Sequence, residues 1–141
     1  MKKRIAQPLL VVALVLILVG SILAQAFNTS LYSVAVDRIS FETERGTLSG
    51  LLYMPEGASA SNPRPTVVVT HGYLNSAEMQ DANAIELSRR GYVVLALDMY
   101  DHGHSAGNEQ NTGAFFSFWP YAQYDAACYM YEQPYVLKDE A

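Results

Sequence analysis

The sequence predicts an α/β domain behind an N-terminal membrane helix, and three observations carry this prediction. Two short runs typical of buried strands, the β-branched run 66–70 and the aliphatic run 93–97, flank a stretch with helical periodicity, which is the order of a βαβ unit. Upstream, two apolar segments at 34–43 and 48–54 are joined by a turn and predict a β-hairpin. A long apolar run near the start of the chain predicts a helix that enters a membrane.

Composition limits the classes of protein that remain. At 141 residues the chain holds one domain at most, and half of its residues are hydrophobic, which is typical of a globular protein. The formal net charge is −5, and a basic cluster at 2–4 leaves the rest more acidic still, so we expect no nucleic-acid partner. The single cysteine, Cys128, forms no internal disulfide, and its helical context predicts a packed side chain.

The first segment predicts a membrane anchor. The basic cluster is followed by an apolar run, 9–24, that is longer than the ~7–15-residue core of a signal peptide. We divide the chain into an anchor, 1–27, and a globular part, 28–141. The positive-inside rule predicts a single-pass protein of the cell membrane whose globular part is extracytoplasmic. A small-x-small pattern ending at Ala26 leaves cleavage, and hence secretion, as an alternative.

The hairpin is the first element expected after the anchor. Segment 34–43 alternates as a half-buried strand does, and a shift in the alternation between Val36 and Ile39 indicates a bulge. Residues 44–46 supply a turn, and 48–54 reads as the returning strand.

The βαβ unit follows. The run 66–70 lacks alternation, which predicts a strand covered by helices on both faces. A helix is expected at 79–90, with Asn75 and Glu78 at the spacing of a capping box. The second buried strand, 93–97, delivers Asp98 to its carboxyl end.

A polar loop, 99–113, is long enough to suggest a function. Pro120 begins a further helix, with one face formed by Tyr121, Tyr124, Ala127, Cys128 and Tyr131. An aromatic cluster precedes and enters this helix, and it either packs in the core or lines an acyl pocket. Its members are Phe115, Phe116, Phe118, Trp119 and Tyr121.

The loop after the first β-branched run carries the first motif, His71-Gly72-Tyr73-Leu74. It resembles the His-Gly-x loop of the α/β-hydrolase superfamily. The resemblance implies that the backbone N–H of Tyr73, or less favourably of Leu74, forms half of an oxyanion hole. Such an N–H, aimed at the charge of a tetrahedral intermediate, contributes ~3 kcal/mol. Gly72 then allows close approach of the backbone, and His71 supports the loop instead of serving as the catalytic base.

The second motif follows the second run, from Asp98 to Ser105. It is similar to the family's D-x-x-G-H-G-x-S loop, which gives Asp98, His102, Gly103 and Ser105 loop-supporting roles. Asp101 stands where the family usually has glycine, although aspartate tolerates left-handed conformations. The implied fold is the N-terminal portion of an α/β-hydrolase: a β-hairpin, a βαβ unit and a further helix.

Three histidines also allow a metal-dependent hydrolase as a remote alternative. His102 and His104 lie close to Asp98 and Asp101, and His71 is on the neighbouring loop. Zinc sites use three or four arranged ligands, and no histidine follows His104. We therefore expect neither a metal nor another cofactor.

The catalytic triad is not assigned to this chain. The family's nucleophile occupies a G-x-S-x-G turn between a later strand and helix, followed by the acid and the histidine. We assign no serine here to that elbow and expect the nucleophile beyond Ala141, so the chain reads as an inactive fragment of an esterase, lipase or peptidase. Without the nucleophile strand, 66–70 is an exposed edge. The alternative is a non-catalytic, membrane-tethered module completed by self-association or by a second polypeptide.

Overall fold

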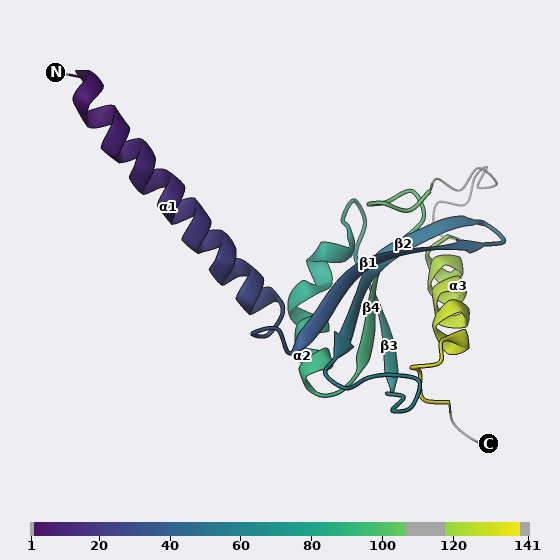
Figure 1. The fold of residues 1–141 in the computed structure, drawn as a ribbon. Helices are drawn as coiled ribbons and strands as arrows, with labels where there is room; N and C mark the ends of the chain where they lie inside the picture. Colours follow the sequence, from purple (N-terminus) through teal and green to yellow (C-terminus); the bar gives the residue numbers. More distant parts are fainter. Residues whose placement is uncertain (1, 107–117, 139–141) are drawn as a thin grey trace.

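The computed structural model describes residues 2–106 and 118–138. It begins with one long helix, α1 (Lys2–Asn28), which projects away from an α/β unit (Figure 1). Within it, Gln7–Asn28 has a mean hydropathy of 2.7, and none of it is buried by the rest of the chain. A helix rises 1.5 Å per residue, so these 22 residues match a hydrocarbon core of about 30 Å. The length and apolarity fit a membrane-spanning helix, and also a signal sequence.

The α/β unit contains one mixed sheet of four strands, which confirms the predicted fold class. The strands stand in the order β1-β2-β4-β3, with β3 and β4 parallel and the other two pairings antiparallel. Their bounds are β1 Val34–Thr43, β2 Gly46–Pro55, β3 Thr66–Thr70 and β4 Val93–Asp98.

The hairpin is regular, and the predicted bulge is wrong. Pairing continues without interruption from Val34 opposite Pro55 to Thr43 opposite Gly46. The apolar residues of β1 change faces instead: Val34 packs in one core cluster, and Phe41 packs in the other on the opposite side of the sheet. The shift in the sequence pattern therefore arises because a different face of β1 is covered at each of its ends, and not because β1 contains an extra residue.

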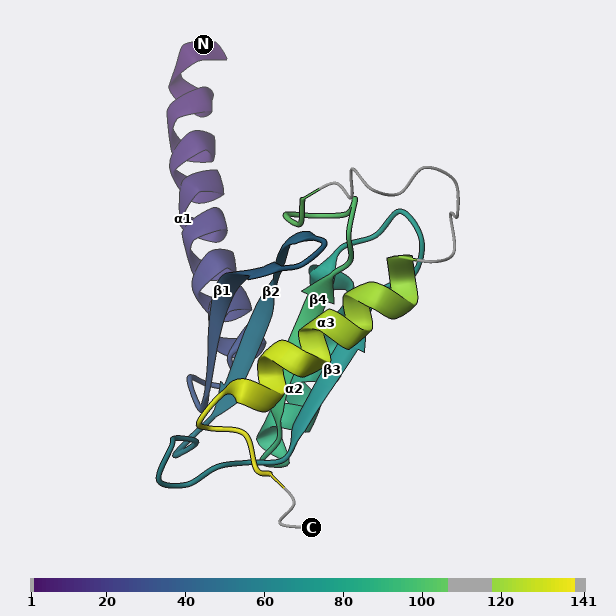
Figure 2. The same ribbon diagram turned by 90° about the vertical axis from the view of Figure 1, so that its right-hand side faces the viewer.

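Helices cover both faces of the sheet (Figure 2). The crossover from β3 to β4 holds a short 3₁₀ turn, η1 (Ala77–Gln80), and α2 (Asp81–Arg89), and α3 (Phe118–Glu132) lies on the other face. Alternate residues of β4 serve the two cores, Leu95 toward α3 and Ala96 toward α2. All of β4 is buried, whereas β3 is half-buried because it lies at the edge of the sheet.

The start of the crossover helix differs from the predicted capping box. Ser76, not Asn75, precedes η1, and no side chain caps either helical segment. The Ser76 hydroxyl donates to Glu78 at 2.6 Å, and Glu78 also forms an ion pair with Arg38 of β1. Because Arg38 draws the Glu78 carboxylate toward β1, that carboxylate does not turn back onto the helix start.

The further helix is present, but its buried face is not the predicted one. Ala122, Ala126 and Met130 face the sheet, whereas the tyrosine face is exposed, and so is Cys128, which was expected to be packed. Small alanines let a helix approach a sheet closely, so the large tyrosines remain outside. Trp119 packs against the core. Phe115 and Phe116 lie outside the described residues, as does the side chain of Phe118.

The segment after α3 begins to pair next to β3. The Arg64 N–H donates to the Tyr135 carbonyl at 2.9 Å, and the Leu137 N–H donates to the Arg64 carbonyl at 2.9 Å. Arg64 and Val136 thus form an isolated parallel bridge. The next carbonyl, that of Pro65, accepts from β4, so the bridge lies on the opposite edge of the strand. Among the described residues, β3 itself pairs only with β4.

Candidate functional site

The two motif loops meet at the carboxyl end of β3 and β4, where Asp98 is fully buried. Its carboxylate accepts backbone N–H groups from Ala77 at 2.6 Å and His104 at 3.0 Å, and Arg38 Nη1 donates to it at 2.9 Å. These donors come from η1, from the loop after β4 and from β1. A buried carboxylate needs such donors and a counter-charge, and Asp98 has both.

Gly103 lies directly against this carboxylate. A Cβ at Gly103 would lie 2.2 Å from Asp98 Oδ1, and the residue has φ +53°. No other residue type fits there without displacing Asp98. Asp101, at the position where the resemblance implies glycine, has φ +63°, so the aspartate does adopt the left-handed conformation.

His71 uses both ring nitrogens, one within its own loop and one to join it to the second loop. Its Nε2 accepts the Met99 N–H at 3.2 Å, which requires Nε2 to be unprotonated. The proton then lies on Nδ1, which donates to the Gly72 carbonyl at 2.7 Å. The ring is buried. With both nitrogens engaged, this geometry fits a supporting role and leaves His71 no free position at which to act as a base.

His102 binds the first loop from the other side. Its Nε2 accepts the Leu74 N–H at 3.3 Å, and its Nδ1 lies 2.9 Å from the Tyr100 carbonyl. Leu74 adopts a left-handed φ of +58°. Its N–H therefore already has a partner in the second loop.

Ser105 requires a correction to the statement that no serine in this chain is assigned to a G-x-S-x-G turn. It has glycines at both second positions, Gly103 and Gly107, so the spacing G-x-S-x-G is present in the sequence. Gly107 lies outside the described residues. In the structure the Ser105 hydroxyl donates to the Asp98 carbonyl at 2.6 Å and accepts the Ser49 N–H at 2.8 Å. Those bonds tie the loop to β2, and no histidine nitrogen bonds the hydroxyl, so its contacts are those of a structural residue and not of an activated nucleophile.

The metal alternative fits these contacts poorly. The His71 and His102 rings have centroids 5.1 Å apart, but each ring already has both nitrogens within hydrogen-bond distance of backbone groups. His104 is exposed, with Nδ1 3.6 Å from Asp98 Oδ2. In the part of the chain that the structure describes, no three His, Cys, Asp or Glu side chains are grouped to hold a metal ion.

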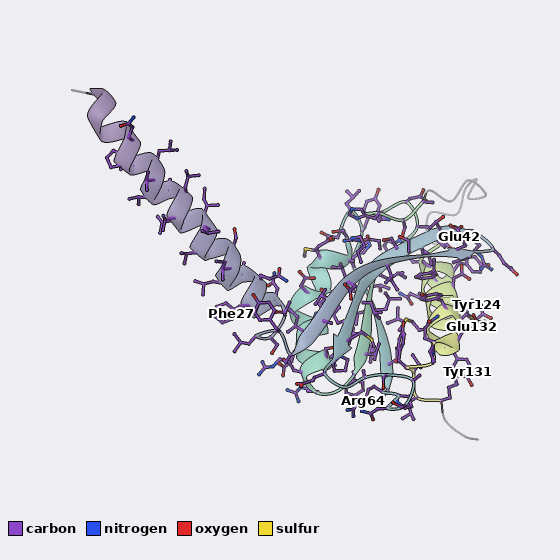
Figure 3. All side chains as sticks on the ribbon, in the orientation of Figure 1. Phe27, Glu42, Arg64, Tyr124, Tyr131 and Glu132 are labelled. Atoms are coloured by element: carbon purple, nitrogen blue, oxygen red, sulfur yellow. The ribbon has the colours of Figure 1, made fainter. Side chains whose placement is uncertain are left out.

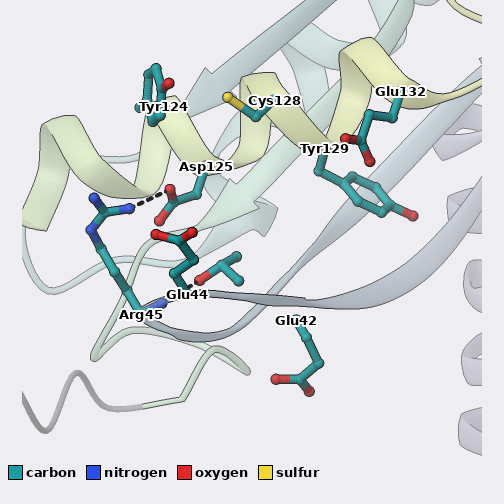
Figure 4. A pocket seen from close by; sticks show the side chains of 9 residues that line it. Glu42, Glu44, Arg45, Tyr124, Asp125, Cys128, Tyr129 and Glu132 are labelled. Carbon is teal, nitrogen blue, oxygen red and sulfur yellow. Dashed lines mark hydrogen bonds and ion pairs between the residues drawn. The ribbon is translucent and has the colours of Figure 1, made fainter.

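A concavity lies elsewhere, between the hairpin turn and α3 (Figure 4). This groove of about 810 Å³ is lined by an Arg45–Asp125 ion pair of 2.6 Å and by carboxylates of Glu42, Glu44 and Glu132. None of the residues lining it belongs to the two motif loops. Arg45, the cation among the described residues that line it, is already paired with Asp125. We therefore place the candidate site at Asp98 and His71, not in the groove.

Behind the groove, Tyr100 connects the hairpin to α3. Its hydroxyl donates to Asp125 at 2.8 Å and also contacts the Thr43 hydroxyl. Burial, together with the neighbouring Asp125 carboxylate, raises the pKa of Tyr100 to about 12. Sequence reasoning gave Tyr100 no role, because nothing in its local pattern reveals a partner 25 positions away.

Comparison with known proteins adds partial structural likenesses. No protein family matches the sequence, and no curated protein matches it. A thioesterase domain from the curacin biosynthetic pathway is 25% identical, with a TM-score of 0.44 over 53% of this chain and 24% of that one. A hypothetical protein from Pseudomonas aeruginosa PAO1 is 28% identical, with a TM-score of 0.46 over 61% of this chain and 27% of that one. The chain thus spans about a quarter of the length of each.

Proposed function

We propose that this chain is the N-terminal part of a membrane-anchored, extracytoplasmic serine hydrolase of the α/β-hydrolase type. It would act on carboxylic ester, lipid or peptide bonds. In this proposal the chain supplies the oxyanion-hole loop and not the Ser/Asp/His triad, so it is inactive alone. The observation that carries the proposal is the pair of loops after β3 and β4, locked to each other through Asp98, His71 and His102.

The chemical role follows from rigidity. Attack on a carbonyl carbon places negative charge on the carbonyl oxygen, and a fixed N–H stabilises that charge without reorganising first. The Tyr73 amide stands between Gly72, whose carbonyl is bonded to His71, and Leu74, whose N–H is bonded to His102. Both flanking peptide groups are thus restrained. A loop held in this way can hold an amide at one position relative to a reacting oxygen.

The Arg64–Val136 bridge supports the proposed position of the missing strand. It lies on the edge of the sheet beyond β3 and runs parallel to it. A strand continued in this register would have its residue opposite Thr70 six positions after Val136. The nucleophile turn would then follow within about five residues, since such a turn stands at the carboxyl end of its strand.

Two experiments test this proposal: sequencing of the coding DNA beyond the codon for Ala141, and labelling of the protein with an active-site probe. We expect a frame that encodes G-x-S-x-G shortly after the position opposite Thr70, and an unrelated continuation would count against the proposal. A fluorophosphonate probe should leave the isolated chain unlabelled because Ser105 is not activated. Mass-spectrometric detection of the probe on Ser105 would refute the claim that this chain holds no nucleophile.

The open edge of β3 favours a second candidate of another class. β3 is half-buried and, within the described residues, pairs on one side only. Unpaired N–H and C=O groups along such an edge can bind another strand. The chain would then be a non-catalytic, membrane-tethered module that self-associates or is completed by a second polypeptide.

A further inference from the structure

The junction between α1 and β1 is an ordered connection, not a flexible linker. Ser30, Leu31 and Tyr32 have φ values of 50°, 58° and 66°. Residues other than glycine rarely adopt this left-handed backbone conformation. Hydrogen bonds hold it: the Leu31 N–H donates to the Ala26 carbonyl at 2.6 Å, and the Val34 N–H donates to the Thr29 carbonyl at 3.0 Å. The direction of α1 relative to the sheet is therefore defined.

Thr29 strengthens the connection from within. It is buried, and its hydroxyl donates to the Gln25 carbonyl at 2.9 Å while accepting the Tyr32 N–H at 3.1 Å. A small cavity next to it is lined by residues of α1 together with Tyr53 and Asp81, so the last turn of α1 lies against the α/β unit. The α/β unit cannot rotate freely about the end of the helix while these contacts persist.

Large apolar side chains surround this junction. Phe27, Leu31 and Tyr32 are 71%, 73% and 68% exposed, and Figure 3 shows Phe27 at the end of α1 next to the α/β unit. Aromatic and apolar residues directly after a spanning segment are typical of the membrane–water interface. The exposed side chains would lie in that interface if α1 crosses the bilayer.

The candidate site lies on the same side of the fold as the helix. In both Figure 1 and Figure 2, the loops that follow β3 and β4 stand level with the C-terminal half of α1, while the C-terminal segment leaves at the opposite end. The two views are related by a turn about the vertical axis, so the heights agree. The carboxyl end of the sheet therefore lies on the side of the fold toward which α1 projects, and the C-terminal segment leaves on the other side.

This end of the sheet also exposes apolar side chains. Tyr73, Leu74 and Met79 are 49%, 77% and 62% exposed. Leu74 combines two unfavourable features, because it is an apolar residue in water and adopts a left-handed φ of +58°. Asparagine or glycine would avoid both. A leucine held outward in this way has a physical reason if its side chain enters an apolar medium.

We propose that the outer leaflet of the bilayer crossed by α1 covers this edge, with Leu74, Tyr73 and Met79 in the headgroup region. The oxyanion loop then stands at the depth of lipid ester carbonyls, and the substrate class is an acyl lipid or lipid-linked ester taken from that leaflet. The substrate assignment rests on the proposed hydrolase function. The lipid contact itself rests only on α1 spanning the bilayer.

The test measures membrane depth with the full chain in phosphatidylcholine vesicles. In a Cys128→Ser background, nitroxide labels are placed at Leu74→Cys, at Leu31→Cys and, as the matched control, at Leu137→Cys, a leucine 51% exposed near the opposite end. For each label, the ratio of its collision rate with oxygen to its collision rate with a water-soluble nickel chelate reports the depth of the label in the bilayer. We expect this ratio to be severalfold higher for the labels at 74 and 31 than for the label at 137.

Each of the other outcomes overturns a defined part of the proposal. If the label at 31 is interfacial while the label at 74 is as water-accessible as that at 137, the lipid contact is wrong and the anchor stands. If all three labels are aqueous and the protein does not float with the vesicles, both the contact and the anchoring are wrong. Neither outcome involves the nucleophile, so the coding-DNA and labelling tests remain independent.

Discussion

At the scale of single residues, Asp98 holds the candidate site together. It is bonded by groups 60 positions upstream at Arg38, 21 positions upstream at Ala77 and six positions downstream at His104. Removing the charge leaves Arg38 without its buried partner and leaves two N–H donors poorly matched. Breaking one half of a buried ion pair is among the costly single changes in a protein.

Asp98→Asn should therefore lower the free energy of unfolding by about 2–4 kcal/mol. Urea unfolding of the full chain in detergent, followed by circular dichroism, measures this change. Asp101→Asn is the matched control, because asparagine also tolerates the left-handed conformation at an exposed site, and it should change stability by about 0.5 kcal/mol or less. Equal effects of the two variants would contradict a central role for Asp98.

Gly103→Ala tests the close approach to the same carboxylate. The new Cβ would overlap Asp98 at a positive φ, so we expect a loss of about 1–3 kcal/mol in the same unfolding measurement. Gly72→Ala is the control from the other loop, since nothing lies within 4 Å of a Cβ there. If Gly103→Ala is as stable as Gly72→Ala, the packing of the loop on Asp98 is not as described.

At the scale of elements, α3 is held by small side chains against the sheet and by Tyr100 and Asp125 at the hairpin. The sequence predicted this helix and its start near Pro120, but it could not predict the buried face. Tyr121, Tyr124 and Tyr131 share a helical face, and periodicity alone favours burying them. Contact distance decides otherwise, because alanines at 122 and 126 allow the helix to lie close to the strands.

Ala126→Leu should destabilise the fold by about 1–3 kcal/mol, because a larger side chain forces α3 away from β4. Ala127→Leu places the same side chain on the exposed face and should stay within about 0.5 kcal/mol of the parent. Thermal unfolding of both variants, compared at the same detergent concentration, checks the orientation of the helix. A larger loss for Ala127→Leu would mean that the predicted tyrosine face is the buried one.

Alkaline pH should weaken the contact between hairpin and α3. Folding raises the pKa of Tyr100 above its ordinary value of 10 to about 12, so the protonated phenol is favoured in the folded state. Its contribution to stability is complete below pH 10 and is lost as pH rises toward 12. The unfolding free energy, measured across this range, should fall less steeply in Tyr100→Phe. An unchanged slope in that variant would exclude Tyr100 as a source of the pH dependence.

At the scale of the whole molecule, the positions of the strands along the chain were easier to predict than the contacts that make the site. The two buried-type runs, 66–70 and 93–97, and the turn between 44 and 46 identify strands locally, because backbone preference and burial act over a few residues. The Arg38–Asp98 and Arg38–Glu78 pairs join distant positions, and no local pattern reveals them. The capping box failed for this reason: Glu78 has a stronger partner across the sheet than at the helix start.

Size-exclusion chromatography of the chain lacking residues 1–27 separates the two proposed functions. A half-sheet that belongs to a larger domain exposes its β3 edge without a specific partner, so we expect soluble aggregate. A discrete dimer would instead favour the interaction module. Multi-angle light scattering supplies the mass of the eluted species, and a stable monomer would contradict both accounts of the edge.

The sheet order also has a consequence for biogenesis. During synthesis β1 emerges first, then β2, β3 and β4, before any residue that follows Val136 arrives. The Asp98 contacts can form at that stage, since all of their donors precede residue 105. At a synthesis rate of about 5–20 residues per second, the outer side of β3 therefore stays unpaired while the following residues are synthesised. In the proposed hydrolase, the bridge at Arg64 is where a further strand would begin to pair with this edge.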